Sequence, residues 1–240
     1  MAVQRRLLTA KWQHLAMLNY EIAPECLAPF LPRGTELDFF QGKTYVSVVG
    51  FQFLNTRIFG IPIPWHCNFE EVNLRFYVRR HSHGTTRRGV CFIKELVPRV
   101  AIAKIANWIY NENYQAVAMQ HQVDRDANTA PHVSYGWKQQ QRWQGLTLTA
   151  QNALQLPAPD SIEEFIAEHY WGYTPQRDGG TVEYEVQHPP WKIWPATNAD
   201  LNCDVASLYG APFVKPLRHL ASAFLAEGSS ISVSTPSKIC

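Results

Sequence analysis

The segment Phe69-Glu-Glu-Val-Asn-Leu-Arg-Phe-Tyr-Val-Arg-Arg80 alternates apolar and polar side chains with a period of two. This alternation predicts a β-strand, because successive side chains of a strand point to opposite faces of its sheet. One face carries only apolar residues, Val72, Leu74, Phe76 and Val78. The other sets polar side chains in line, about 7 Å apart, on Glu71, Asn73, Arg75, Tyr77 and Arg79. If water covers the polar face, the segment is an ordinary amphipathic strand, whereas a cavity there would make it a binding site.

The composition is that of a folded, aromatic-rich protein. Hydrophobic residues make up 46% of the 240 residues and charged ones 18%, which excludes long disordered regions. Eight Trp, ten Tyr and twelve Phe favour strands and an aromatic-lined pocket. The net charge of +2 gives no reason to expect nucleic acid or a membrane surface as a partner.

The cysteines argue for a reducing compartment. They are five in number and scattered, with no Cys-x-x-Cys pair, which disfavours both a disulfide framework and a structural zinc site. The N-terminal residues include no apolar stretch long enough for a signal peptide, and no run approaches a membrane span. No phosphate-binding loop, dinucleotide fingerprint or nucleophile elbow occurs. We therefore expect a cytoplasmic protein without a metal or cofactor.

Similar patterns predict further strands around the opening segment. They cover residues 15–22, 36–40, 44–54, 89–97, 171–175, 181–188, 222–226 and 230–235. Residues 36–40 and 44–54 are expected to form a hairpin around Gln41-Gly42. The polar stretch 133–150 is expected to form an exposed edge strand or hairpin.

Helices are expected to be few. Pro24 opens a short helical turn, helical spacing covers residues 99–110, and Ser161 begins a helix through a capping box. Thr197 or Asn198 is expected to cap another short helix. Because no flexible linker divides the chain, we expect one mainly β (α+β) domain over residues 1–240.

Several motifs, in order along nearly the whole chain, carry a family resemblance. They are Met17-Leu-Asn-Tyr-Glu-Ile22, Leu31-Pro32-x-Gly34-Thr-Glu-Leu-Asp38, Tyr45-Val-Ser-Val-Val-Gly-Phe51, Glu71-Val-Asn-Leu-Arg-Phe-Tyr-Val-Arg79, Arg88-Gly-Val, Glu95-x-Val-Pro-Arg99, His169-Tyr-Trp-Gly-Tyr173 and Ser222-Ala-Phe-Leu-Ala-Glu-Gly-Ser229. With these motifs the chain resembles the YqjF-like proteins of the DUF2071 family, grouped with the acetoacetate-decarboxylase-like superfamily. The resemblance implies a β-barrel with a few peripheral helices and an interior pocket.

The chain departs from the decarboxylase pattern at the catalytic lysines. That enzyme uses a Schiff-base lysine activated by a second, adjacent cationic group, but no Lys-Lys pair occurs here. The matching segment, 99–114, contains only Lys104. The resemblance implies that Glu71 corresponds to the acidic residue of the decarboxylase site.

The polar row supplies the leading candidates for a site. Glu71 is the candidate proton carrier, and Arg75 is the natural partner of an anion. The alternative is a solvated strand face or an internal Glu–Arg pair. The candidate ligand-binding residues are Asn73, Arg75, Tyr77, Tyr45, His169 and Trp171.

Lys94 and Glu95 face opposite ways on the next predicted strand, so at most one of them can share the pocket. Lys94 falls on an apolar face with Phe92 and Leu96, where loss of solvent would lower its pKa and make it a candidate nucleophile. The alternative is a lysine that extends to the rim.

The remaining candidates have ordinary alternatives. His81 and His83 lie in a basic loop and lack a third metal ligand nearby. His169 is either a hydrogen-bonded core histidine or, with Trp171, part of a pocket wall. The segment His188-Pro-Pro-Trp-Lys-Ile-Trp194 is either a lid or a packed loop.

Three hypotheses for function follow. The first is binding of a small organic ligand that carries a carboxylate or carbonyl. The second is a lyase or isomerase acting on such a ligand, with Glu71 as proton carrier. The third is a non-catalytic interaction module, in which the strand 133–150 pairs with another copy to form a homo-oligomer.

Overall fold

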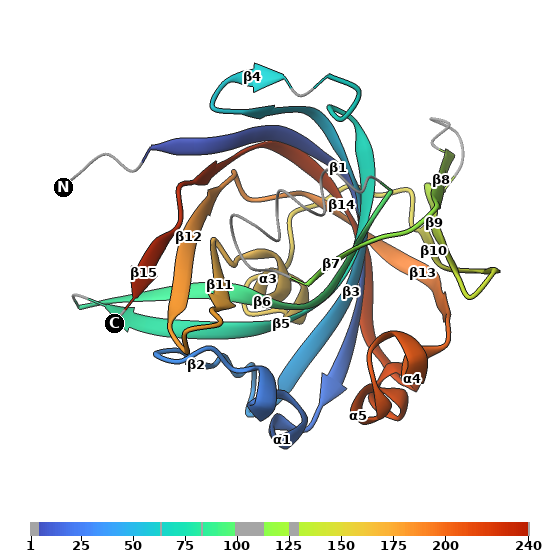
Figure 1. Cartoon of the computed structure of the whole chain (residues 1–240). Helices are drawn as coiled ribbons and strands as arrows, with labels where there is room; N and C mark the ends of the chain where they lie inside the picture. Colours follow the sequence, from blue (N-terminus) through green and yellow to red (C-terminus); the bar gives the residue numbers. More distant parts are fainter. Residues whose placement is uncertain (1–4, 63, 83, 99–112, 125–129, 240) are drawn as a thin grey trace.

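The chain forms a large curved β-sheet with a few short helices at its periphery (Figure 1). The computed structural model describes residues 5–62, 64–82, 84–98, 113–124 and 130–239. The predicted class, mainly β with few helices, is confirmed. The strands are β1 (Arg6–Ile22), β2 (Glu36–Leu37), β3 (Thr44–Ile58), β4 (Ile61–Pro62), β5 (Phe69–Ser82), β6 (Thr85–Val97), β7 (Tyr114–Ala116), β8 (Met119–Asp124), β9 (His132–Gln139), β10 (Arg142–Ala150), β11 (Trp171–Pro175), β12 (Thr181–Gln187), β13 (Ile193–Asn202), β14 (Leu220–Ser234) and β15 (Ser237–Ile239). The helices are α1 (Pro24–Leu27), η1 (Ala28–Phe30), α3 (Ile162–Ala167), α4 (Val205–Leu208), α5 (Ala211–Val214) and η2 (Pro216–Arg218).

Seven of these strands pair with one another round a ring. Their order is β12-β11-β6-β5-β3-β1-β14, and β14 pairs in turn with β12, where Val233 lies opposite Val186. Every pairing in the ring is antiparallel except that of β11 with β6. Figure 1 shows these strands curving round a central region in which α3 is drawn. Each ring strand therefore has an inner and an outer face.

Strand β5 is buried on both faces. Its apolar residues Val72, Leu74, Phe76 and Val78 are fully buried in the cluster outside the ring. On the inner face, the solvent-exposed fractions of Glu71, Asn73 and Arg75 are only 2%, 1% and 9%. The polar row thus belongs to the interior of the protein, and the interpretation as a solvated strand face is wrong.

A second layer of sheet covers the outer face of the ring. Strand β13 pairs with the ring strand β14 and continues through β10, β9 and β8. The apolar side chains of β9, including Tyr135 and Trp137, share one core with those of β3 and β5. Tyr135 packs so closely on Gly50 of β3 that a Cβ there would lie 2.6 Å from the ring. The described residues therefore form two cores, one between the layers and one inside the ring.

The stretch 133–150 forms the predicted hairpin, but it is not an exposed edge. Strand β9 pairs with β8, and β10 pairs with β13, so both outer edges of the hairpin are occupied. The polar residues that suggested an edge lie mainly around the turn at Gln140 and Gln141, both of which have positive φ. The edge pairing that we considered for an oligomer is therefore not available at this hairpin.

Three other local predictions differ from the structure. Residues 36–37 form a strand pair with β5 rather than with β3. The Glu36 carboxylate also forms an ion pair with Arg79 Nε at 2.7 Å. The turn at Gln41-Gly42 forms as expected. Residues 197–202 belong to β13, and Asp204 instead caps the next helix. The two terminal strands are one strand, β14, that passes through Gly228 with φ of 77°.

Two of the predicted helices form as expected, and a third lies outside the described residues. Pro24 opens α1, and the Ser161 hydroxyl accepts a hydrogen bond from the Glu164 amide at 3.2 Å, as a capping box requires. The expected helix 99–110, which contains Lys104, lies outside the described residues. Within the described part of the chain, no helix is both long and apolar enough to cross a membrane.

Candidate functional site

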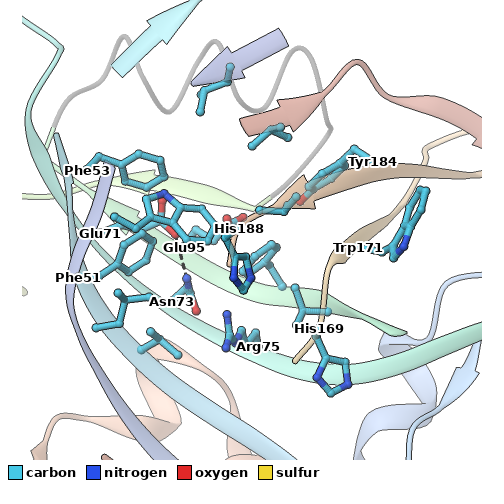
Figure 2. A pocket seen from close by; sticks show the side chains of 18 of the residues that line it. Phe51, Phe53, Glu71, Asn73, Arg75, Glu95, His169, Trp171, Tyr184 and His188 are labelled. Carbon is cyan, nitrogen blue, oxygen red and sulfur yellow. Dashed lines mark hydrogen bonds between the residues drawn. The ribbon is translucent and has the colours of Figure 1, made fainter. Parts of the chain in front are cut away.

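A cavity of about 100 Å³ lies inside the ring of strands. Its wall combines aromatic and aliphatic side chains with a few buried polar groups (Figure 2). The polar and charged lining residues are Glu71, Asn73, Arg75, Glu95, His169 and His188. The apolar lining includes Trp12, Phe51, Phe53, Phe92, Trp171 and Trp191.

The inner face of β5 supplies a hydrogen-bonded polar row. Asn73 Nδ2 donates to Glu71 Oε1 at 2.9 Å, and the hydroxyl of Tyr114 donates to Glu71 Oε2 at 3.3 Å. The side-chain amide oxygen of Asn73, Oδ1, is buried and has no hydrogen-bond partner among the described residues. Three of the predicted site residues, Glu71, Asn73 and Arg75, are thus brought together.

Arg75 is a buried cation without an anionic partner in the described part of the chain. Its Nη2 contacts the sulfur of Met17 at 3.9 Å, and its guanidinium lies 5.7 Å from the ring of Tyr77. Its Nε has no hydrogen-bond partner among those same residues. A buried charge is costly unless it is paired and hydrogen bonded. The Arg75 guanidinium thus lies on the cavity wall with no ion pair to any described residue.

A β-bulge decides which side chain of β6 faces the cavity. Asn73 pairs with Glu95, Leu74 with Lys94 and Arg75 with Phe92, so Ile93 is the extra residue. Because a bulge shifts the alternation by one residue, Phe92 and Glu95 both line the cavity. Lys94 does not line it and lies opposite Leu74, whose side chain belongs to the outer core. The prediction that Lys94 shares a face with Phe92 is wrong.

Lys94 is half-buried on that outer face, and burial lowers its pKa. The lowered pKa alone does not make it a candidate nucleophile for the pocket, since its side chain is on the other side of the sheet. The sequence pattern identified Glu95 only as the alternative to Lys94.

His169 is held at the cavity by a hydrogen bond to Asp38, which also forms an ion pair with Arg88. Its Nε2 lies 3.1 Å from Asp38 Oδ2, and Arg88 Nε donates to the same oxygen at 2.7 Å. Burial lowers the pKa of His169 to about 4, although the neighbouring Asp38 acts to raise it. The bonds from His169 and Arg88 leave the pKa of Asp38 below its ordinary value in spite of burial. Neutral His169 therefore donates through Nε2, because a carboxylate can only accept.

The segment that follows β12 contributes two aromatic side chains to the wall. The rings of His188 and Trp191 stack at 4.0 Å with an interplanar angle of 14°. The indole of Trp191 donates to the hydroxyl of Ser229 at 2.8 Å, which fixes the pair against β14. The rings of this segment pack against the protein and form part of the pocket wall, an arrangement that both a packed loop and a closed lid would have.

Tyr45 and Tyr77 lie outside the cavity lining. The Tyr77 hydroxyl shares a 2.5 Å hydrogen bond with Ser47 Oγ, and its ring contacts Phe165 and His169. Tyr45 packs on Phe165 at 6.2 Å. The structure thus uses both tyrosines to support the wall, whereas His169 and Trp171 line the cavity itself.

The residues missed by sequence reasoning come mainly from distant parts of the chain. Asp38 lies 131 residues from its partner His169, and His188 gave no signal beyond its place in an aromatic segment. His81 bonds Glu36 at 2.9 Å on the exposed β5–β6 hairpin, away from the cavity. The described residues contain no group of three or more potential metal ligands.

The fold is similar to that of acetoacetate decarboxylase-like proteins. The enduracididine biosynthesis enzyme MppR, complexed with pyruvate, matches with a TM-score of 0.66 and 12% identity over 99% of this chain and 91% of that chain. Acetoacetate decarboxylase from Legionella pneumophila matches with a TM-score of 0.66 and 12% identity over 98% and 88% of the two chains. An acetoacetate decarboxylase-like enzyme from Sphingomonas wittichii RW1 matches with a TM-score of 0.66 and 14% identity over 98% and 93%. At these identities the likeness concerns the fold alone.

The chain belongs to the DUF2071 family of uncharacterized conserved proteins, whose profile matches residues 9–230. The uncharacterized protein YqjF of Bacillus subtilis (strain 168) is 24% identical over 220 residues, which cover 88% of this chain and 85% of that protein. The family resemblance of the sequence motifs is thereby confirmed.

Proposed function

We propose that the protein binds a small organic acid inside the ring, with the carboxylate of the acid on Arg75. The observation that carries this proposal is the buried guanidinium, which has no anionic partner among the residues described and lies on the cavity wall beside Asn73. Charge-assisted hydrogen bonds between arginine and a carboxylate are among the stronger polar contacts in proteins. An acid would therefore remove an energetic cost that the free protein carries.

The cavity limits the size of such an acid. A cavity of roughly 150 Å³ holds a benzene molecule, so about 100 Å³ suits an acid with fewer atoms. The fold neighbour MppR is complexed with pyruvate, a three-carbon acid. Acids of two to four carbons are therefore the first to test.

A thermal-shift and calorimetry screen of such acids tests the proposal. Wild-type protein should be stabilised by at least one acid, and Arg75→Met should weaken its binding by roughly 10- to 100-fold, the loss of one or two charge-assisted bonds. The matched control is Arg79→Met on the same strand, because Arg79 already pairs with Glu36 outside the cavity. Binding that is equally strong in wild type and Arg75→Met would refute the proposal.

A second candidate function is proton transfer on such an acid, as in a lyase or isomerase. It is favoured by Glu71, a buried carboxylate on the cavity wall that receives hydrogen bonds from Asn73 and Tyr114. A general base must lie within reach of the proton that it moves. NMR in D₂O should then show exchange at the carbon next to the carboxylate, and Glu71→Gln should abolish it. Absence of exchange for every acid that binds would leave binding alone as the function.

A further inference from the structure

The end of the cavity around Arg75 is rich in hydrogen-bond acceptors. Asn73 Oδ1 and His169 Nδ1 are buried without a partner in the described part of the chain. His188 engages Pro189 through Nδ1, and no residue that the structure describes bonds its Nε2. Arg75 and both histidines line the same cavity, and the charge of Arg75 contributes to lowering the pKa of both histidines. Figure 2 shows the His188 ring directed into the pocket toward the side where Asn73 and Arg75 lie.

The protonation of both histidines follows from their partners. The carbonyl of Pro189 can only accept, so Nδ1 of His188 carries the proton in the 2.9 Å bond. Burial lowers the pKa of His188 to about 4, so the ring is neutral at pH 7 and Nε2 presents a lone pair. By the same argument His169 donates Nε2–H to Asp38 and presents a lone pair on Nδ1.

The His188 ring is also held in place. It stacks on Trp191 at 4.0 Å and contacts the ring of Tyr170 at 4.6 Å. A rigid acceptor discriminates more strongly than a mobile one, because it cannot turn away from an unsuitable group. Besides Arg75 Nε, the described cavity wall has an unpartnered donor in Trp12 Nε1. The Trp12 ring packs against the rings of Phe51 and Phe53.

A ligand that places only acceptors beside these atoms would leave them unsatisfied. The oxygen of a keto group accepts and cannot donate, and a methylene group does neither. Resting on the proposed function, we infer that the acid bound here carries a hydrogen-bond donor, a hydroxyl or a protonated amino group, next to its carboxylate. His188 is then the residue that selects for this donor, while Arg75 holds the carboxylate.

Four three-carbon acids of nearly equal size test this assignment. Propionate has no added group, pyruvate adds an acceptor, lactate adds a hydroxyl, and alanine adds an ammonium group. Calorimetry should show lactate or alanine binding about threefold to tenfold more tightly than propionate, the gain of one hydrogen bond. Pyruvate should bind no better than propionate. The comparison of lactate with alanine shows which donor is preferred.

His188→Phe keeps a flat ring that can stack on Trp191 but removes the acceptor. It should abolish the preference for the donor-bearing acid, so that lactate, alanine and propionate bind the variant with similar affinities. The control His219→Phe replaces an exposed histidine outside the cavity and should keep the preference. A preference that survives in His188→Phe would overturn the role of His188.

Histidine ¹⁵N NMR of the wild-type protein tests the same point without a variant. The Nε2 resonance of His188 should move toward the hydrogen-bonded position when lactate or alanine is added and should stay in place with propionate. If the four acids bind equally and Nε2 does not respond, the inference is wrong while the proposed function stands. If no acid binds at all, the proposed function itself fails.

Discussion

At the scale of single residues, the site is defined by buried polar atoms whose partners are incomplete. Arg75 lacks an anion and Asn73 Oδ1 lacks a donor among the described residues, although each is at least nine-tenths buried. Such atoms are rare in folded proteins, because each one costs free energy unless something satisfies it. That both residues line the same cavity is the strongest reason to place a ligand there.

His169 makes stability depend on pH in a defined direction. In the unfolded chain its pKa is near 6.5, and burial lowers it to about 4 in the folded protein. Between these values the unfolded state binds more protons, so the free energy of unfolding falls as the pH falls from about 6.5 to 4. The contribution from His169 between pH 7 and pH 5 should be about 2 kcal/mol.

Urea unfolding at pH 7 and pH 5 measures this contribution. His169→Gln should lose less stability over that interval than wild type, whereas replacement of the exposed His219 by Gln should leave the dependence unchanged. An identical pH dependence in wild type and His169→Gln would show that the buried imidazole does not titrate as described.

At the scale of elements, strand β5 was predictable, whereas the neighbouring strand β6 was only partly so. Alternation from Phe69 to Arg80 correctly separates the two faces of β5, because a regular strand keeps its period of two. The alternation of β6 fails at Ile93, where a bulge adds one residue. Nothing in the local composition marks this bulge, so Lys94 was expected where Glu95 lies.

The bulge leads to different predictions for two adjacent residues. Glu95→Gln replaces an ionisable carboxyl group of the cavity wall by a neutral amide and should strengthen binding of an acid by about threefold to tenfold, on the order of 1 kcal/mol. Lys94→Gln, on the outer face, should leave the affinity unchanged. Calorimetry with the best acid compares them. A larger effect at Lys94 than at Glu95 would contradict the register of β6.

At the scale of the whole molecule, the interior site depends on pairings between distant segments. Asp38, His169 and His188 come from three separate parts of the chain, and the fold brings His169 into contact with Asp38 and sets both histidines on the cavity wall. The family motifs included Asp38 and His169 but could not assign their contact, since motif order carries no distances. Likewise, the polar composition of 133–150 did not indicate that β9 and β10 lie inside a second layer. The fold was thus predictable mainly through the family resemblance. The contact of Asp38 with His169 and the place of His188 in the cavity wall became known only from the three-dimensional structure.

The second layer should contribute strongly to stability. Trp137 is fully buried between the layers, whereas Trp143 on the same hairpin is 49% exposed. Trp137→Ala should lower the free energy of unfolding by about 3–5 kcal/mol, as expected for a large residue in a core. Trp143→Ala should change it by less than about 1 kcal/mol. Denaturant titrations of both variants provide the measurement, and equal losses would contradict the packing of β9 on the ring.

The central claim is that Arg75 receives the carboxylate of a small acid. Its most direct test is ¹⁵N NMR of the arginine Nε–H group, with the Arg75 resonance assigned from its loss in Arg75→Met. On addition of the acid that stabilises the protein most, this resonance should move downfield and its hydrogen exchange should slow, because Nε–H gains an acceptor that no described residue now provides. A resonance that stays unchanged while the acid binds would contradict the account.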